Sequence, residues 1–172
     1  MMSLETLENH RSRQFIKGQT TTGPRVIGMS PQRRDKFSVA KRSQIMSKIR
    51  SKNTGLDLAM MRLLRTGRVR YRSYPKIFGT PDFLVYEKVA VFCDSSFWHG
   101  RHWEKLRSQL QRGSNASYWV RHIDGNRRRD RLVTRRLRKS GYRVARFWDS
   151  EILDRPQECL RKLRVIAGYS TK

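Results

Sequence analysis

Apolar residues recur at helical spacing just after residue 53. In the segment 54–67 (TGLDLAMMRLLRTG), one face of the expected helix carries Leu56, Met60, Leu63 and Leu64. Thr54 is suited to begin this helix and Gly67 to end it. A second segment, 155–168 (RPQECLRKLRVIAG), predicts a closing helix with Pro156 in its first turn.

Short runs of β-branched and aromatic residues predict strands between these helices. The runs occupy residues 69–75, 81–86, 89–94 and 142–148. Only Glu87 and Lys88 separate the second run from the third, so we expect an antiparallel hairpin there. In such a hairpin, residue 82 would lie opposite about residue 92.

The chain between the hairpin and the last predicted strand is less regular. Residues 101–121 carry no clear period, and 112–117 (RGSNAS) predict a loop. Residues 125–141 predict a strongly basic helix that ends at Gly141. Its expected buried stripe is Leu132, Val133 and Leu137. The order of helix, three strands, helix, strand and helix is typical of an α/β or α+β domain with a mixed central β-sheet flanked by helices.

Charge adds an expectation about partners. Lys and Arg total 39 against 14 Asp and Glu, which gives a formal net charge of +25. Folding does not require this excess, and self-repulsion works against compaction, so a polyanionic partner is expected. Nucleic acid is the first candidate, and an acidic membrane surface or an acidic protein are the alternatives.

The remaining composition predicts a cytoplasmic protein. No apolar run approaches the roughly 20 residues that span a bilayer, and the N-terminus lacks the apolar region of a signal peptide. The two cysteines do not suggest a disulfide framework. Residues 1–38, rich in Gly, Pro, Thr and basic residues, predict either a disordered tail or a basic arm that orders on a phosphate backbone. The globular domain is expected over 39–172.

Two aspartates and a histidine surround the hairpin. Asp82 and Asp94 would project from the same end of its strands, where two carboxylates can hold Mg²⁺. Alternatively, Asp82 caps a turn and Asp94 ends a strand, both solvated. His99 could take a proton from water if Asp130, on the basic helix, oriented its other ring nitrogen. The alternatives are a structural histidine and an aspartate that forms ion pairs along its own helix.

Several separated segments resemble one nuclease family. Pro81-Asp82 followed by a strand pair resembles the PD-(D/E)xK nuclease pattern, with Ser96 at the lysine position. The segments RSQIMSKIRSKNTGLD, GTPDF and VFCDSSFWHG, and the spacing from Trp119 to Asp130, resemble the very-short-patch-repair (Vsr-like) endonucleases and the related EDxHD homing endonucleases. The resemblance covers roughly residues 41–152. It implies a restriction-endonuclease-like fold and a Mg²⁺-dependent endonuclease that hydrolyses phosphodiester bonds in double-stranded DNA.

The resemblance also implies roles for individual residues. Asp82 would bind Mg²⁺, with the backbone carbonyl of Cys93 as a second ligand, and His99 and Asp130 would form the catalytic pair. Asp57 falls where the family has a helical glutamate near the active site. Thr54-x-x-Asp57 is, alternatively, a capping box that begins the helix. Asp94 stands where the repair enzymes have histidine and the homing group varies.

Further implied roles concern DNA binding and zinc. The residues expected to wedge between base pairs are Met46, Phe97, Trp98 and Trp119. Without the resemblance, aromatic residues in such positions would be assigned to the core. Phosphate contacts are expected from Arg127, Arg128 and Arg129. The family's structural zinc ligands correspond to Ser96, Arg101, Trp103 and Ser150, none of which is a usual zinc ligand, so no structural zinc is expected.

Two functions from different classes remain open. One is a DNA endonuclease, acting either as a mobile-element homing enzyme or as a mismatch-nicking repair enzyme, with a nick or a double-strand break as product. The other is a catalytically retired nuclease fold that serves as a basic nucleic-acid-binding subunit of a larger assembly. Retention of Asp82, His99 and Asp130 together favours the enzyme.

Overall fold

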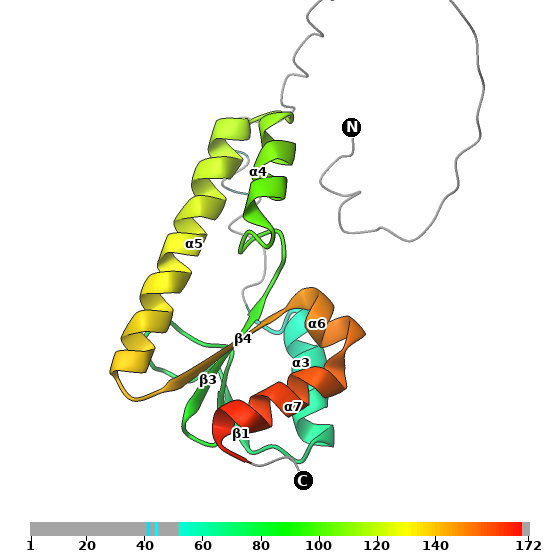
Figure 1. Ribbon diagram of the computed structural model, residues 1–172, viewed down its shortest axis with the longest axis vertical. Coiled ribbons are helices and arrows are strands. Elements are labelled where there is room, and N and C mark those ends of the chain that lie inside the picture. Colours follow the sequence, from blue (N-terminus) through cyan, green and yellow to red (C-terminus); the bar gives the residue numbers. More distant parts are fainter. Residues whose placement is uncertain (1–40, 42–43, 45–51, 170–172) are drawn as a thin grey trace, which may run out of the picture.

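The computed structural model describes residues 41, 44 and 52–169. Its elements, in chain order, are α3 (Gly55–Thr66), β1 (Tyr71–Ser73), β2 (Phe83–Val85), β3 (Val89–Asp94), α4 (Trp103–Gln111), α5 (Ala116–Lys139), β4 (Arg143–Trp148), α6 (Asp149–Asp154) and α7 (Pro156–Ala167) (Figure 1). The predicted arm over 1–38 and Met46 lie outside the described residues. Among the helices of the described part, none is both long and apolar enough to cross a bilayer.

The four strands form one mixed sheet in the order β1-β2-β3-β4. β1 pairs antiparallel with β2, and β2 antiparallel with β3, whereas β3 and β4 run parallel. Phe83 lies opposite Val91, so residues 82 and 92 face each other in the predicted register. A mixed sheet with helices on both faces confirms the expected fold class.

The two faces of the sheet pack against different helices (Figure 1). Val91 and Phe147 face a core formed with α3, α6 and α7, and the partly buried Cys93 packs against it. Phe92 faces the other way and forms a smaller core with Val133 and Leu137 of α5. Since consecutive residues of a strand point to opposite faces, Asp94 is directed toward α5, like Phe92.

The α-helical parts depart from the sequence prediction in three places. α4 and α6 were not predicted, and α5 begins at Ala116 instead of residue 125. α4 carries Trp103, Leu106 and Leu110 at helical spacing, but these residues are only partly buried and the stripe spans just three positions, so the sequence analysis did not identify the helix. The first half of α5 buries only Trp119 and Ile123. Leu132, assigned to the buried stripe, is 37% exposed.

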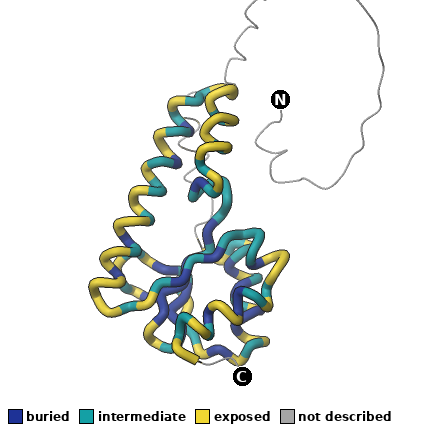
Figure 2. Tube along the Cα trace, in the orientation of Figure 1, coloured by how far each residue is buried: buried dark blue, intermediate teal, exposed yellow. Residues whose placement is uncertain are grey.

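The paired helices α4 and α5 extend away from the sheet, and their outer surfaces are largely exposed (Figure 2). α5 is anchored at its C-terminal half, where Val133 and Leu137 contact the sheet. Gly79 makes this contact close: a Cβ there would lie 2.3 Å from a methyl carbon of Val133, and the glycine has φ +78°. The turn that leads to Asp82 therefore packs directly against α5.

Candidate functional site

The candidate site lies where β3 and β4 end and β2 begins. These strand ends together form one edge of the sheet. The first helical turn of α3 brings Asp57 to this edge, and the residue before β2 is Asp82. Oxygens of Asp57 and Asp82 and the Cys93 sulfur lie within 4.8 Å of one another. Two carboxylates from segments far apart in the sequence thus converge on one point.

Asp57 caps α3 and also accepts a hydrogen bond from Tyr74. Its Oδ2 accepts hydrogen bonds from the Thr54 N–H at 2.9 Å and from the Tyr74 hydroxyl at 3.1 Å. The Thr54 hydroxyl in turn accepts from the Asp57 N–H, which completes the capping box. Capping engages Oδ2 and leaves Oδ1 without a hydrogen bond among the described residues, so the cap does not prevent Asp57 from binding a cation.

The surroundings of Asp82 disfavour the ionised form of its carboxyl group. Its Oδ2 accepts a 2.7 Å hydrogen bond from the Cys93 N–H. Burial, and to a smaller extent the negative charges of Asp57 and Asp94, raise the pKa of Asp82 to about 6, although that hydrogen bond acts in the opposite direction. A divalent cation between Asp57 and Asp82 would remove this repulsion, so the donor set fits a hard metal ion.

The Cys93 thiol is a poor ligand for Mg²⁺. Burial, followed by the charge of Asp82, raises the pKa of the thiol far above its ordinary value, so it stays protonated. Mg²⁺ takes oxygen ligands, and a neutral thiol offers none. The oxygen expected from this residue is its backbone carbonyl, and that ligand remains a prediction.

His99 and Asp130 are in contact. The Nδ1 atom of His99 lies 2.7 Å from Oδ2 of Asp130. His99 belongs to the loop after β3 and Asp130 to the middle of α5, so the contact joins these two elements. Burial would raise the pKa of Asp130, but the His99 hydrogen bond and the Arg146 charge hold it below its ordinary value. Asp130 is therefore an ionised acceptor that leaves Nε2 as the free ring nitrogen. Its partners come from outside α5, unlike the ion pairs along α5 that Asp124 makes with Arg127 and Arg128.

Asp94 is bound by an arginine. Both of its oxygens accept from Arg146, at 2.6 Å from Nε and 2.7 Å from Nη2. Its side chain is only 4% exposed. The structure thus groups Asp82 with Asp57, whereas Asp94 faces α5 and Arg146. Asp94 also lies 3.5 Å from Nδ1 of His99.

The aromatic residues predicted to enter DNA form one cluster beside this site. Phe97 and Trp98 follow β3 and pack on Trp119 of α5, with ring centroids 5.7 and 5.8 Å away. Trp119 is 6% exposed, as expected for a core residue, whereas Phe97 and Trp98 are partly exposed. Asn126 donates to the Trp98 carbonyl at 3.0 Å and fixes the loop against α5. Contact with DNA remains a prediction for all three aromatic residues.

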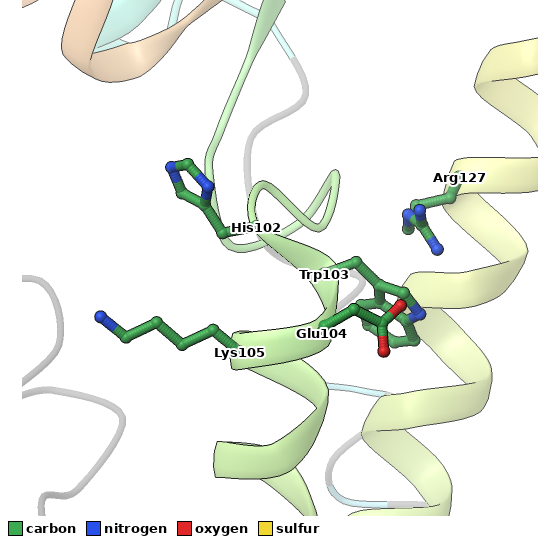
Figure 3. A pocket seen from close by; sticks show the side chains of 5 residues that line it. All are labelled: His102, Trp103, Glu104, Lys105 and Arg127. Carbon is green, nitrogen blue, oxygen red and sulfur yellow. The ribbon is translucent and has the colours of Figure 1, made fainter.

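Three consecutive arginines of α5 follow the aromatic cluster along the helix. Arg128 and Arg129 are exposed, and the Arg127 guanidinium lies 4.9 Å from the Trp103 ring. An open cavity of about 600 Å³ lies here between α4 and α5. In Figure 3, Trp103 and Glu104 point toward α5, whereas His102 and Lys105 point away from it.

The four positions that correspond to the family's zinc ligands make other contacts. Ser96 donates to Asp149 from its N–H at 2.8 Å and also from its hydroxyl, and Arg101 donates to the Ser150 hydroxyl. Trp103 faces Arg127. These hydrogen bonds tie the loop after β3 to α6. The expectation that the protein folds without zinc remains a prediction.

The hydrogen bonds between the loop after β3 and α6 lead to a prediction about the free energy of unfolding. Asp149→Ala removes the acceptor of both Ser96 bonds and of the Ser150 N–H at 2.8 Å. Hydrogen bonds to a charged group contribute about 1.5–3 kcal/mol each, so we expect the variant to lose about 3 kcal/mol of unfolding free energy. Urea unfolding measures it, with the exposed Asp154→Ala as control. Equal midpoints for the two variants would show that the tie does not stabilise the fold.

Three residues of the site were not predicted from the sequence. Tyr74 donates to Asp57, Asp149 accepts from Ser96, and Arg146 binds two aspartates. Arg146 had a usable signal, because it interrupts the apolar run of a predicted core strand. Tyr74 and Asp149 had none, because each acts on a residue distant in sequence.

Comparison with known proteins identifies a family for this chain. The family model described as DNA mismatch endonuclease Vsr matches residues 34–105. A type II nicking enzyme of Neisseria meningitidis serogroup C, V.NmeDIP, is 36% identical over 132 residues, which cover 76% of this chain and 88% of that protein. V.HpaIIP, a type II nicking enzyme of Haemophilus parainfluenzae, is 36% identical over 72% of this chain and 89% of its own length.

A mismatch enzyme is also among the relatives. DNA mismatch endonuclease Vsr of Escherichia coli (strain K12) is 32% identical over 127 residues, 70% of this chain and 77% of that protein. These matches span most of both chains, and the described part contains a mixed sheet with an acidic cluster at its edge. The chain therefore belongs to the Vsr-like family of DNA endonucleases.

Proposed function

We propose that this protein is a Mg²⁺-dependent endonuclease that nicks one strand of double-stranded DNA. Its carboxylates Asp57 and Asp82, with the Cys93 carbonyl, would hold the metal ion. The bound ion would polarise a phosphate oxygen and favour ionisation of water. The observation that carries the proposal is the 2.7 Å contact between His99 and Asp130 next to the convergent carboxylates.

His99 acts as the general base. Asp130 accepts the Nδ1 proton and orients the ring, so that Nε2 takes a proton from the attacking water. The ionised state of Asp130, maintained by its cationic neighbours, stabilises the imidazolium that forms. Ser96, at the lysine position of the superfamily pattern, is engaged by Asp149, which leaves the histidine as the available base.

DNA is held by charge and by the aromatic cluster. Arg128 and Arg129 extend from α5 into solvent, where they bind phosphates without reading sequence. Phe97 and Trp98 stand beside the candidate base and insert between base pairs, which kinks the duplex. A DNA substrate implies action in the cytoplasm, where cellular or phage DNA is found.

The proposal is tested by plasmid nicking. With Mg²⁺, supercoiled plasmid should convert to the open circle, and excess EDTA should stop conversion while salt-sensitive binding remains. Because relatives are named nicking and mismatch enzymes, oligonucleotide duplexes that carry each single mismatch should be compared with the fully paired duplex. Tight binding without cleavage of any substrate would favour the alternative, a retired nuclease fold that only binds nucleic acid.

A further inference from the structure

Arg146 connects two acidic residues that flank the candidate base. On β4 it forms a fork on Asp94 through Nε and Nη2, at 2.6 and 2.7 Å. Nη2 also lies 3.0 Å from Oδ1 of Asp130. The other oxygen of Asp130 meets Nδ1 of His99 at 2.7 Å. These contacts join His99, Asp130, Arg146 and Asp94 in one continuous chain.

The chemistry of the guanidinium explains these contacts. Nη2 carries two N–H groups in one plane, so it can donate to Asp94 and Asp130 at the same time. The Phe92 ring lies 4.5 Å from the guanidinium carbon, next to Arg146 in the strand register, and covers one face of the group. A lysine ammonium is a point charge and could not reproduce the planar fork.

We propose that Arg146 is a positioning residue for the His99–Asp130 pair, an inference that rests on the proposed role of His99. Two carboxylates compete for Nδ1 of His99: Asp130 at 2.7 Å and Asp94 at 3.5 Å. Arg146 binds both oxygens of Asp94 and one oxygen of Asp130. Its contact with Oδ1 of Asp130 directs Oδ2 of that carboxylate toward the ring.

If Arg146 only stabilised the fold, its ion pair with Asp94 would be sufficient. The pair with Asp94 alone would neutralise the buried carboxylate, which is 4% exposed. The additional contact from β4 to Asp130 of α5 is the one that reaches the base. A structural and a positioning role therefore differ in what happens when Asp94 and Arg146 are neutralised together.

The test compares Arg146→Met with the double variant Asp94→Asn/Arg146→Met. Arg146→Met leaves Asp94 buried and unpaired, so its melting temperature should fall and its kcat for nicking should fall about 100-fold. The double variant removes the unpaired charge and should recover the melting temperature, whereas its kcat stays low. Recovery of kcat together with stability would overturn the proposal, as would a normal kcat in Arg146→Met.

Controls separate charge from geometry. Arg143→Met removes one positive charge from the same strand, where Arg143 donates to the Ile166 carbonyl away from the site. Its effect on KM measures the loss of general attraction to DNA, and Arg146→Met should match it in KM but not in kcat. Arg146→Lys keeps the charge and should recover less than about a tenth of the wild-type kcat. Full recovery with lysine would show that charge alone suffices and would overturn the proposal.

His99→Ala in the same assay distinguishes failure of the proposed function from failure of the inference on Arg146. If His99→Ala nicks normally, the proposed function of the pair is wrong, whatever the arginine variants do. If His99→Ala is inactive and the double variant nicks normally, the role of His99 stands and only the inference on Arg146 fails.

Discussion

Asp82→Asn is expected to abolish nicking and, in the absence of metal, to make the protein more stable near pH 7.5. Asparagine keeps an oxygen that can accept the Cys93 N–H bond but removes the charge that would bind the cation. We expect nicking to fall at least about 1000-fold, because several kcal/mol of transition-state stabilisation depend on the ion. Loss of activity would therefore accompany a gain in stability.

The sign of the stability change follows from the direction of the pKa shift. Asp82 has a folded-state pKa of about 6, above its ordinary value of 3.8. The folded state therefore disfavours the ionised form, and wild-type stability falls as the pH rises from about 4 through 6. Asparagine does not titrate, so the variant avoids this penalty, which is on the order of 2 kcal/mol above pH 6. Near pH 4 the two proteins should differ little.

Thermal unfolding with and without Mg²⁺ provides the measurement. In EDTA near pH 7.5, Asp82→Asn should melt above the wild type, and the difference should disappear near pH 4. Mg²⁺ should raise the melting temperature of the wild type more than that of the variant, because binding to the folded state stabilises it. Asp154→Asn, an exposed carboxylate of α6, controls for the change in net charge. A less stable Asp82→Asn near pH 7.5 would contradict the assigned electrostatic strain.

His99→Ala is expected to lower the nicking rate by about 100-fold to 10,000-fold, the range that general-base catalysis contributes. Binding should persist, because the phosphate contacts assigned to α5 do not involve this ring. Asp130→Asn should lower the rate as well, since an asparagine can present its NH₂ group to Nδ1 and favour the wrong tautomer.

Single-turnover nicking and a salt titration of binding measure the two effects separately. The plot of log affinity against log salt concentration should keep its slope in His99→Ala. His102→Ala is the matched control, because His102 is an exposed histidine nearby that points away from α5. Equal rates for the two alanine variants would remove His99 from the mechanism.

Local patterns predicted the elements that carry their own signal. The spacing of Met60, Leu63 and Leu64 located α3, because a buried stripe on a surface helix repeats every three to four residues. The short separation at Glu87 and Lys88 predicted the hairpin, and the expected reversal near Glu87 predicted its register. In the structure Val85 pairs with Val89, so Tyr86 also belongs to the turn. The signal of α4 was weaker, because its apolar positions Trp103, Leu106 and Leu110 are few and only partly buried.

The residues of the candidate site were also only partly predictable from local patterns. Motif spacing in the sequence was enough to select Asp82, His99 and Asp130 as candidates, because each lies at a conspicuous position in a short segment. It also paired His99 with Asp130, which are in contact, but it could not show which residues lie beside Asp82 and Asp94. Asp57 and Arg146 enter the site from α3 and β4, and only the packed sheet brings those elements to one edge.

By itself, then, the sequence determined the fold class and the basic character of the protein, and it supplied the residues that we propose for hydrolysis. Tertiary structure alone decided that Asp82 converges with Asp57, and that Asp94 turns away to Arg146. The physical reason is the alternation of side chains along β3: Cys93 faces α3, whereas Asp94 faces α5. Which carboxylate meets which partner depends on how the two helical layers dock on the sheet, and long-range packing of this kind leaves no periodic trace in the chain.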